Sequence, residues 1–233
     1  YNFLNVYQKI HNFCVVELGG FYLDVIKDRQ YTCQADSLAR RSTQTAMYHI
    51  LEMLSRLIAP ILSFTAEELW EHIPGEKADS VFLTSFSDAI GELPESKEFD
   101  DQFWSKLMEV KSAVNKELES KRSEKVIGSG LDAEVNLFCD EELMAILERL
   151  GEELRFVLIV SKVSIESIDK AGSEARLTSN SGLKVLVSAS KFLKCDRCWH
   201  HHSSVGKNSE HSLLCERCIT TVSYTHLRAH ETS

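Results

Sequence analysis

Long apolar runs are missing from this sequence of 233 residues, and no stretch approaches the length of a membrane span. No signal peptide opens the chain, so nothing indicates export to an oxidising compartment. Glycine-rich phosphate loops and internal repeats at solenoid periods are absent as well. We therefore expect neither a membrane partner nor a P-loop or repeat protein, and we predict a cytoplasmic location.

Positive charge is also scarce, because 26 Lys and Arg face 35 Asp and Glu and leave a net charge of −9. A nucleic-acid partner would therefore be held by local patches and not by the average field of the protein. The composition, 43% hydrophobic and 26% charged, is globular and allows one large or two small domains. Residue 1 is Tyr and already lies in an amphipathic pattern, so we expect the C-terminal piece of a longer chain.

Four of the seven cysteines form two Cys-x-x-Cys pairs, Cys195 with Cys198 and Cys215 with Cys218. Two residues between thiols let a tight turn aim both sulfur atoms at one ion, and two such turns complete a tetrahedron around zinc. All four ligands would be protein, so the predicted Zn²⁺ is structural and folds the segment around it. Two disulfides or a redox pair are the alternatives, but disulfides need an oxidising compartment and a redox motif needs a single pair.

The residues around these cysteines are basic and aromatic. Residues 191–222 hold five Lys or Arg against three acids, in contrast to the whole chain. Such a surface is typical of contacts with a phosphate backbone and unstacked bases. The Trp that follows the first pair could equally well serve as a hydrophobic cap over the metal. The His after it could support the metal ligands or simply lie at the surface. The candidate RNA contacts of this segment are Arg197, Trp199, His200, Lys207 and Arg217.

Apolar residues at steps of three and four predict helices over the first hundred residues. The first runs over 2–28, with a kink or a close helix contact at Gly19-Gly20. A second is predicted to begin near Ser37 as N-cap and to bend or end at Pro60. A capping box that starts at Thr65 predicts a third helix.

Two basic groups on the predicted helices are weaker candidates for RNA contact. Arg40 and Arg41 lie in the first turns of the second helix. A fourth helix, over 101–124, has a Lys-rich face. Solvated faces are the commoner role for such groups, and phosphate binding is the more specific alternative.

The pattern changes after residue 130. Alternation predicts a strand over 132–138, and β-rich runs at 155–163 and 183–188 predict two more, with a short helix over 140–150. Residues 223–233 have no core pattern and are predicted to be a non-native tail. We expect a helical bundle over 1–100, a helix with a small α+β unit over 101–190, and a zinc finger over 191–222.

Four stretches resemble bacterial-type isoleucyl-tRNA synthetases, and together they span roughly residues 1–222. One, over 59–70, is similar to a segment shared with the valyl, leucyl and methionyl enzymes, whereas 114–135 resembles the isoleucyl enzyme alone. The others are 17–29 and the two cysteine pairs with Trp199 and His200. Two departures are Gly19-Gly20, where the family tends to carry serines, and the sequence after Cys218.

The resemblance implies a mainly α fold. It consists of the helical-bundle anticodon-binding domain of the synthetases for isoleucine, valine, leucine and methionine, then a small α+β unit and a four-cysteine zinc knuckle. It implies isoleucine tRNA as the partner of a monomer, with ATP and Mg²⁺ acting in the full-length enzyme. The family's catalytic signatures, His-Ile-Gly-His and Lys-Met-Ser-Lys-Ser, are absent from this sequence. No catalytic residue is therefore assigned, and we expect the chain alone to be inactive.

Three other interpretations stay open. The same region of a valyl or leucyl enzyme fits the helical part, although the finger with its Trp-His pair favours the isoleucyl one. A free-standing zinc-ribbon module that binds RNA would belong to another class. A helical interaction domain with structural zinc and no RNA is the third interpretation, and an acidic or mixed surface around Arg197 and Trp199 would favour it.

Overall fold

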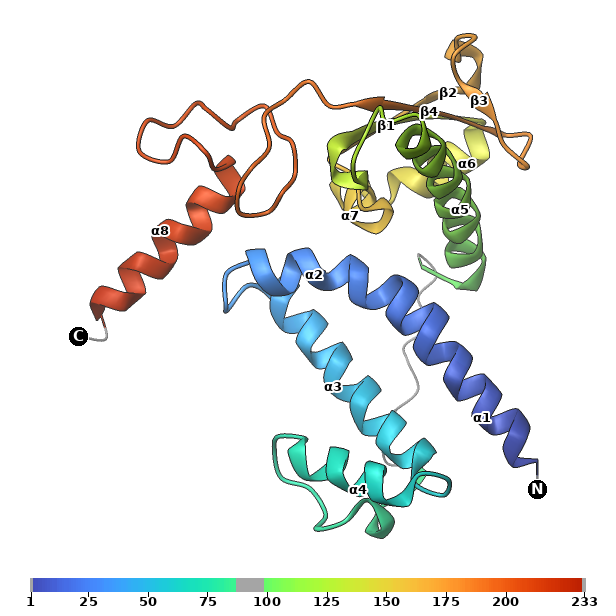
Figure 1. The fold of residues 1–233 in the computed structure, drawn as a ribbon, viewed down its shortest axis with the longest axis vertical. Helices are drawn as coiled ribbons and strands as arrows, with labels where there is room; N and C mark the ends of the chain where they lie inside the picture. Colours follow the sequence, from blue (N-terminus) through green and yellow to red (C-terminus); the bar gives the residue numbers. More distant parts are fainter. Residues whose placement is uncertain (1, 87–98, 232–233) are drawn as a thin grey trace. The chain divides into compact units, whose positions relative to one another are not determined.

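The computed structural model describes residues 2–86 and 99–231, and from residue 224 onward it describes the backbone alone. The chain divides into two compact units, Tyr1–Glu95 (unit 1) and Ser96–Ser233 (unit 2). Helices dominate both, and a small sheet lies in unit 2 (Figure 1). Within the described residues, no helix is both long and apolar enough to cross a membrane. The predicted mainly α fold with a small α+β part is thus confirmed.

Unit 1 opens with one continuous helical run. It comprises α1 (Phe3–Asn12), the π-helical segment η1 (Phe13–Tyr22) and α2 (Leu23–Thr32). The interruption expected at Gly19-Gly20 is this wider π segment, and the helix continues through it. A Cβ at Gly19 would lie 3.0 Å from the carbonyl oxygen of Cys14, so the backbone approaches closely there. The helix is therefore longer than predicted.

The second half of unit 1 holds α3 (Leu38–Ile58), α4 (Ser63–His72) and the short η2 (Val81–Leu83). Ser37 caps α3 as predicted, because its Oγ accepts a hydrogen bond from the backbone N–H of Arg40. The capping box predicted at Thr65 is wrong, since α4 already begins at Ser63. The turn that follows α3 sets this start, with the N–H of Leu62 bonded to the Ile58 carbonyl.

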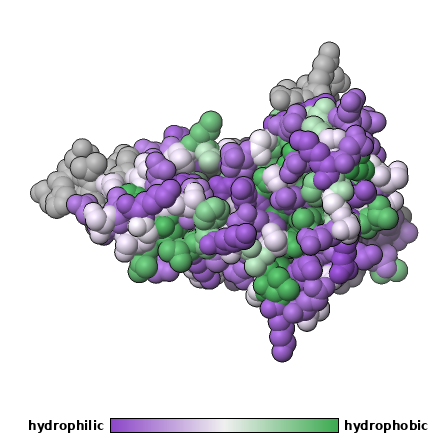
Figure 2. All heavy atoms as spheres, turned by 90° about the horizontal axis from the view of Figure 1, so that it is seen from above, coloured by the Kyte–Doolittle hydropathy of each residue, from purple (hydrophilic) through white to green (hydrophobic). Residues whose placement is uncertain are grey.

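The core of unit 1 is centred on Trp70, which is 1% exposed and donates its Nε1–H to the Ala78 carbonyl at 2.8 Å. The Arg56 guanidinium lies over the same ring, 5.0 Å from its centre. By contrast, α1 and η1 bury no residue fully. Figure 2 draws the whole chain, and on the face that it shows, hydrophobic side chains form separate patches within a mostly hydrophilic surface. The structural centre of unit 1 is therefore the α3–α4 corner. The cluster comprises Ala59, Ala66, Trp70, Ile73 and Val81.

Unit 2 is built on a four-stranded sheet in the order β2-β1-β4-β3. Its central strand β1 (Ala133–Cys139) pairs in parallel with β2 (Lys162–Ser167) and antiparallel with β4 (Leu183–Ala189). The edge strand β3 (Arg176–Leu177) pairs with β4. The long helix α5 (Asp101–Ser123) packs on β4 and buries Leu107, Val110 and Val114. Of its predicted basic face, Lys111 is instead buried and donates to the Val157 carbonyl at 3.0 Å.

The connection from β1 to β2 contains α6 (Glu141–Glu148), η5 (Gly151–Glu153) and α7 (Leu154–Leu158). The strand predicted over 155–163 is therefore wrong in its first half. Leu154, Val157 and Leu158 recur at helical spacing and are all buried, so tertiary packing overrides their β propensity. Ile159 then takes a left-handed conformation, with φ +57°, which ends the helix before β2.

The remainder of unit 2 is an irregular knuckle over 190–215 that leads into α8 (Glu216–Glu231). An isolated bridge between Lys194 and His201 closes its first loop. The predicted loop over 76–101 falls partly on 87–98, outside the described residues. In the predicted tail over 223–233 the helical backbone of α8 continues to Glu231. The non-native origin of this tail stays a prediction, as do the three domain boundaries.

Candidate zinc centre and nucleic-acid interface

The structure brings the four predicted ligands, Cys195, Cys198, Cys215 and Cys218, into one buried cluster. Their sulfur atoms all lie within 4.8 Å of one another. The Sγ atoms of Cys198 and Cys215 are 3.7 Å apart. All four cysteines are at most 8% exposed, and Val205 and Leu214 pack beside them. The sixteen residues between Cys198 and Cys215 thus fold back so that the four sulfur donors form a closed set.

Each cysteine pair is held by its own tight turn. The N–H of Trp199 donates to the Cys195 carbonyl at 2.8 Å, and the N–H of Cys218 donates to the Cys215 carbonyl at 3.0 Å. The two turns also face each other, because the N–H of Cys215 points at Cys195 Sγ over 3.3 Å. The second pair lies at the start of α8, so a helix end fixes its direction. The local sequence therefore aims four sulfur atoms at one point.

The donor set fits a structural zinc ion. Zinc–sulfur bonds of about 2.3 Å in a tetrahedron place neighbouring sulfur atoms about 3.8 Å apart, close to the Cys198–Cys215 separation. Four thiolates satisfy the usual coordination number of zinc, so no position remains for a catalytic water. In the described residues all seven cysteines are free thiols, and no disulfide competes with this arrangement.

The crowded thiols perturb one another. Hydrogen bonds from Cys198 and then Cys218 lower the pKa of Cys215. The same contacts, first with Cys198 and then with Cys215, raise the pKa of Cys218. Arg197 adds a positive charge, with Nη1 3.7 Å from Cys218 Sγ. Sulfur atoms this close cannot all ionise unless a cation balances them, which is the electrostatic role of a bound metal.

Trp199 projects from the first turn and is 59% exposed. Its backbone has φ +65°, a left-handed conformation that is rare for a bulky residue. The Nζ of Lys194 lies 5.4 Å from the centre of its ring. The Trp199 side chain does not belong to the buried group around the cysteines, so the hydrophobic cap considered above is not what this geometry shows.

His200 turns the other way and is 4% exposed. Its ring meets Phe156 edge to face at 5.5 Å, and its Nδ1 lies 3.5 Å from Nη1 of Arg155. The Arg217 guanidinium lies over the same Phe156 ring, 5.2 Å from its centre. His200 therefore packs the knuckle against α7, and its predicted contact with RNA would require this packing to open.

The other predicted contacts differ in exposure. Arg197 and Arg217 are half-buried beside the cysteine cluster, whereas Lys207 is exposed on the loop between the pairs. Arg40 and Arg41 belong to the first turns of α3 in unit 1, and of the two Arg41 is the exposed one. The structure thus gathers the knuckle residues around one centre. Arg40 and Arg41 belong to the other unit, so they are described only by their place in α3.

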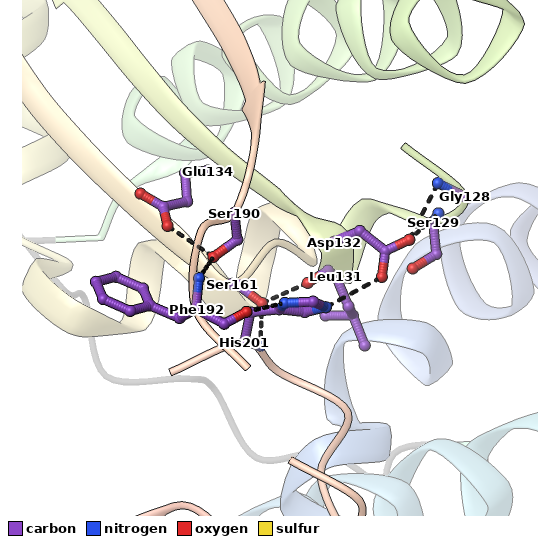
Figure 3. A network of polar contacts seen from close by, with 9 residues as sticks. All are labelled: Gly128, Ser129, Leu131, Asp132, Glu134, Ser161, Ser190, Phe192 and His201. Atoms are coloured by element: carbon purple, nitrogen blue, oxygen red, sulfur yellow. Dashed lines mark hydrogen bonds and ion pairs between the residues drawn. The ribbon is translucent and has the colours of Figure 1, made fainter. Parts of the chain in front are cut away.

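Sequence reasoning missed the residue that joins the knuckle to the sheet, His201 (Figure 3). Its backbone N–H donates to Ser161 Oγ at 2.7 Å, and its Nδ1 lies 2.6 Å from the Phe192 carbonyl oxygen. Its Nε2 lies 3.4 Å from Oδ1 of Asp132, an ion pair when the ring is protonated. The contacts come from three separate segments, and no local pattern in the sequence could have indicated them.

Asp132 is itself held in place, since its Oδ2 accepts the N–H groups of Gly128 at 3.0 Å and Ser129 at 2.7 Å. Partial burial raises its pKa, but these backbone hydrogen bonds, the Ser129 side chain and the charge of His201 outweigh burial and lower it. Ser190 completes the network by donating to Glu134 at 2.7 Å. We call these contacts the His201 network (Figure 3). They join Gly128, Ser129, Leu131, Asp132, Glu134, Ser161, Ser190, Phe192 and His201.

Comparison with known proteins agrees with both parts of the structure. Residues 1–137 match the family described as the anticodon-binding domain of tRNA ligase. Residues 192–221 match the zinc finger found in FPG and IleRS, which covers all four cysteines.

Curated relatives match nearly the whole chain, and those cited here are named isoleucine–tRNA ligase. The protein of Stutzerimonas stutzeri (strain A1501) is 57% identical over 222 residues, which is 95% of this chain and 24% of the relative. Those of Pseudomonas putida (strain W619) and Alkalilimnicola ehrlichii are 55% and 52% identical, over 96% and 95% of this chain and 24% of each relative. The chain thus spans about a quarter of the length of these relatives. The chain is thus similar to isoleucine–tRNA ligases over this quarter of their length, and it belongs to the tRNA ligase family defined by this anticodon-binding domain.

Proposed function

We propose that this chain is the part of an isoleucine–tRNA ligase that binds the anticodon stem-loop of isoleucine tRNA. The whole protein would attach isoleucine to that tRNA with ATP and Mg²⁺, which act in the part that this chain does not include. The names of the relatives support this activity. The two catalytic signatures of the family are absent from the sequence, so the chain alone is expected to be inactive. We further propose a cytoplasmic monomer.

The observation that carries the proposal is the exposed Trp199 on a turn fixed by the cysteine cluster. Proteins that read RNA loops stack unpaired bases on aromatic rings, and each such contact contributes roughly 1–3 kcal/mol. Because the turn is anchored at Cys195, stacking would cost little ordering of the protein. Lys194 beside the ring adds a cation near the phosphate of a stacked nucleotide.

Zinc would serve this role indirectly. Cys195, Cys198, Cys215 and Cys218 would hold the ion, and the ion would supply the rigidity that keeps both turns in place. Around it, Lys207 and the half-buried Arg197 and Arg217 would meet the RNA backbone. Exposed Arg41, with Arg40 beside it, is the candidate in unit 1 for a second phosphate contact.

The proposal is tested by measuring binding of the zinc-loaded chain to isoleucine tRNA and to valine tRNA, with and without a chelator, at two salt concentrations. We expect tighter binding to isoleucine tRNA, and we expect the chelator to abolish this preference. Binding that is weak, unselective and indifferent to the chelator would overturn the assignment of the knuckle as an anticodon reader. Measuring at two salt concentrations separates phosphate contacts, which salt weakens, from stacking contacts.

A further inference from the structure

Unit 2 contains a recess of about 250 Å³ between the sheet and the knuckle. One wall comes from η5 and α7, a second from the start of β2, and a third from the knuckle before and after the first cysteine pair. It lies beside the zinc centre, because Arg155 and His202 also line the small cavity that reaches Cys198 and Cys215. The lining residues that matter here are Glu152, Arg155, Lys162, Phe192, His201 and His202.

The charges of this recess favour an anion. Arg155 and Lys162 face one acid, Glu152, in a chain whose overall charge is −9. Glu152 is 92% exposed and lies 3.5 Å from the Arg155 guanidinium, so water screens that pair and it can open readily. Lys162 is exposed, and none of the described residues forms an ion pair with it. Two cations and two imidazoles therefore line one small space.

The walls are fixed before any ligand arrives. Ser161, Phe192 and His201 line the recess and also belong to the His201 network. Figure 3 shows the Phe192 ring extending away from His201, while its backbone N–H and carbonyl are both hydrogen-bonded. The ring is 40% exposed, so it offers an aromatic surface at a rigid position. A preformed recess costs little conformational entropy on binding.

We propose that this recess binds one nucleotide of a single-stranded RNA segment, with the phosphate at Arg155 and Lys162 and the base against Phe192. Cationic side chains, which bind the phosphate, and an aromatic ring, which stacks on the base, are the two elements by which proteins hold unpaired nucleotides. The proposal rests on the proposed function and extends it, because it adds a second base contact on the side of the knuckle that faces α7. Trp199 and the recess would then engage different nucleotides of one loop.

The test uses the zinc-loaded chain, an isoleucine-tRNA anticodon stem-loop and three single variants. Lys162→Ala is expected to weaken binding and to lower the slope of log affinity against log salt by about one, the value for one lost phosphate contact. Phe192→Ala is expected to weaken binding about tenfold with the slope unchanged, since stacking involves no counterion release. Lys170→Ala removes an exposed lysine of unit 2 outside the recess and is expected to change neither quantity. Zinc content and circular dichroism verify that each variant is folded.

The outcomes separate the recess from the proposed function. If the chain binds RNA but Lys162→Ala and Phe192→Ala both behave like Lys170→Ala, the recess proposal is wrong and the anticodon function stands. If the chain does not bind RNA at all, the proposed function fails, and the recess is then judged with uridine monophosphate.

That titration follows the ring signals of His201 and His202 by NMR, with inorganic phosphate as the comparison. Signals that shift with the nucleotide in the wild type and not in Lys162→Ala support the recess. Signals that do not shift overturn it, and equal shifts with inorganic phosphate overturn the contact between the base and Phe192.

Discussion

His201 and Asp132 lie 3.4 Å apart, Nε2 to Oδ1, and this contact connects the zinc knuckle to the turn before β1. The other ring nitrogen of His201 faces the Phe192 carbonyl at 2.6 Å, so an oxygen acceptor lies at each end of the imidazole. A ring with a proton on each nitrogen would pair with the carboxylate at one end and donate to the carbonyl at the other. The knuckle is therefore fastened to the sheet by side chains, in addition to the covalent chain.

Replacing Asp132 by Asn should weaken this joint and lower the stability of unit 2 at neutral pH. The pKa of Asp132 is lowered in the folded protein, so its contribution is present above its unfolded pKa of about 3.9 and is lost as pH falls through the lower folded value. The difference in free energy of unfolding between wild type and Asp132→Asn should thus be fully present above about pH 4 and shrink as the pH falls below it. Urea titrations at a series of pH values measure it.

Acid also releases zinc from thiolates, but it does so in both proteins, and so the difference between them reports on the carboxylate. Asp169→Asn, at an exposed position of the same unit, is the matched control and should follow the wild type. A constant difference down to pH 3 would show that Asp132 acts through its shape and not through its charge.

Trp199→Ala should weaken binding of the anticodon stem-loop by roughly 1–3 kcal/mol while zinc content stays at one ion per chain. Trp199→Gly should lose the same binding energy, and it should be more stable than the alanine variant because glycine accepts the left-handed backbone at φ +65°. Fluorescence anisotropy of labelled RNA and thermal unfolding measure the two effects. Unchanged binding at full zinc occupancy would leave Trp199 without a role in recognition.

The parts of the fold that the sequence predicted depend on local pattern. The Ser37 cap, the span of α5, the strand β1 and the short helix α6 all follow from residues within one or two turns of each position. The four cysteines of the cluster could be grouped for the same reason, since each Cys-x-x-Cys pair is local and four-cysteine sites have a typical spacing.

What the sequence could not predict depends on contacts between distant segments. Residues 154–158 have β propensity but form a helix, because their apolar side chains fill the space beside α5. His200 looks like a surface residue next to Trp199, yet Phe156 and Arg155, far away in the chain, bury it. The recess beside the knuckle is likewise made of three segments, so neither its lysine nor its phenylalanine could be singled out from the sequence.

Cys195→Ser should release zinc and disorder residues 191–222 while the helices of unit 1 and α5 remain. The knuckle has its own small buried cluster, formed by the four cysteines with Val205, whereas the unit 1 core around Trp70 shares no residue with it. Far-ultraviolet circular dichroism should therefore fall modestly, and amide signals of the knuckle should collapse in NMR spectra. Cooperative loss of all helicity would contradict an independent knuckle.

The seven cysteines should react with iodoacetamide in three stages. Cys14 and Cys33 are partly exposed and should react in the native, zinc-loaded protein. The four clustered cysteines should react after a chelator removes zinc, because ligation protects thiolates. Burial, aided by the nearby Asp140, raises the pKa of Cys139 to about 12, so this thiol should react last, on unfolding in urea. Intact-mass spectra should show two, then six, then seven adducts. Six adducts in the native protein without chelator would mean that the cluster does not hold a metal.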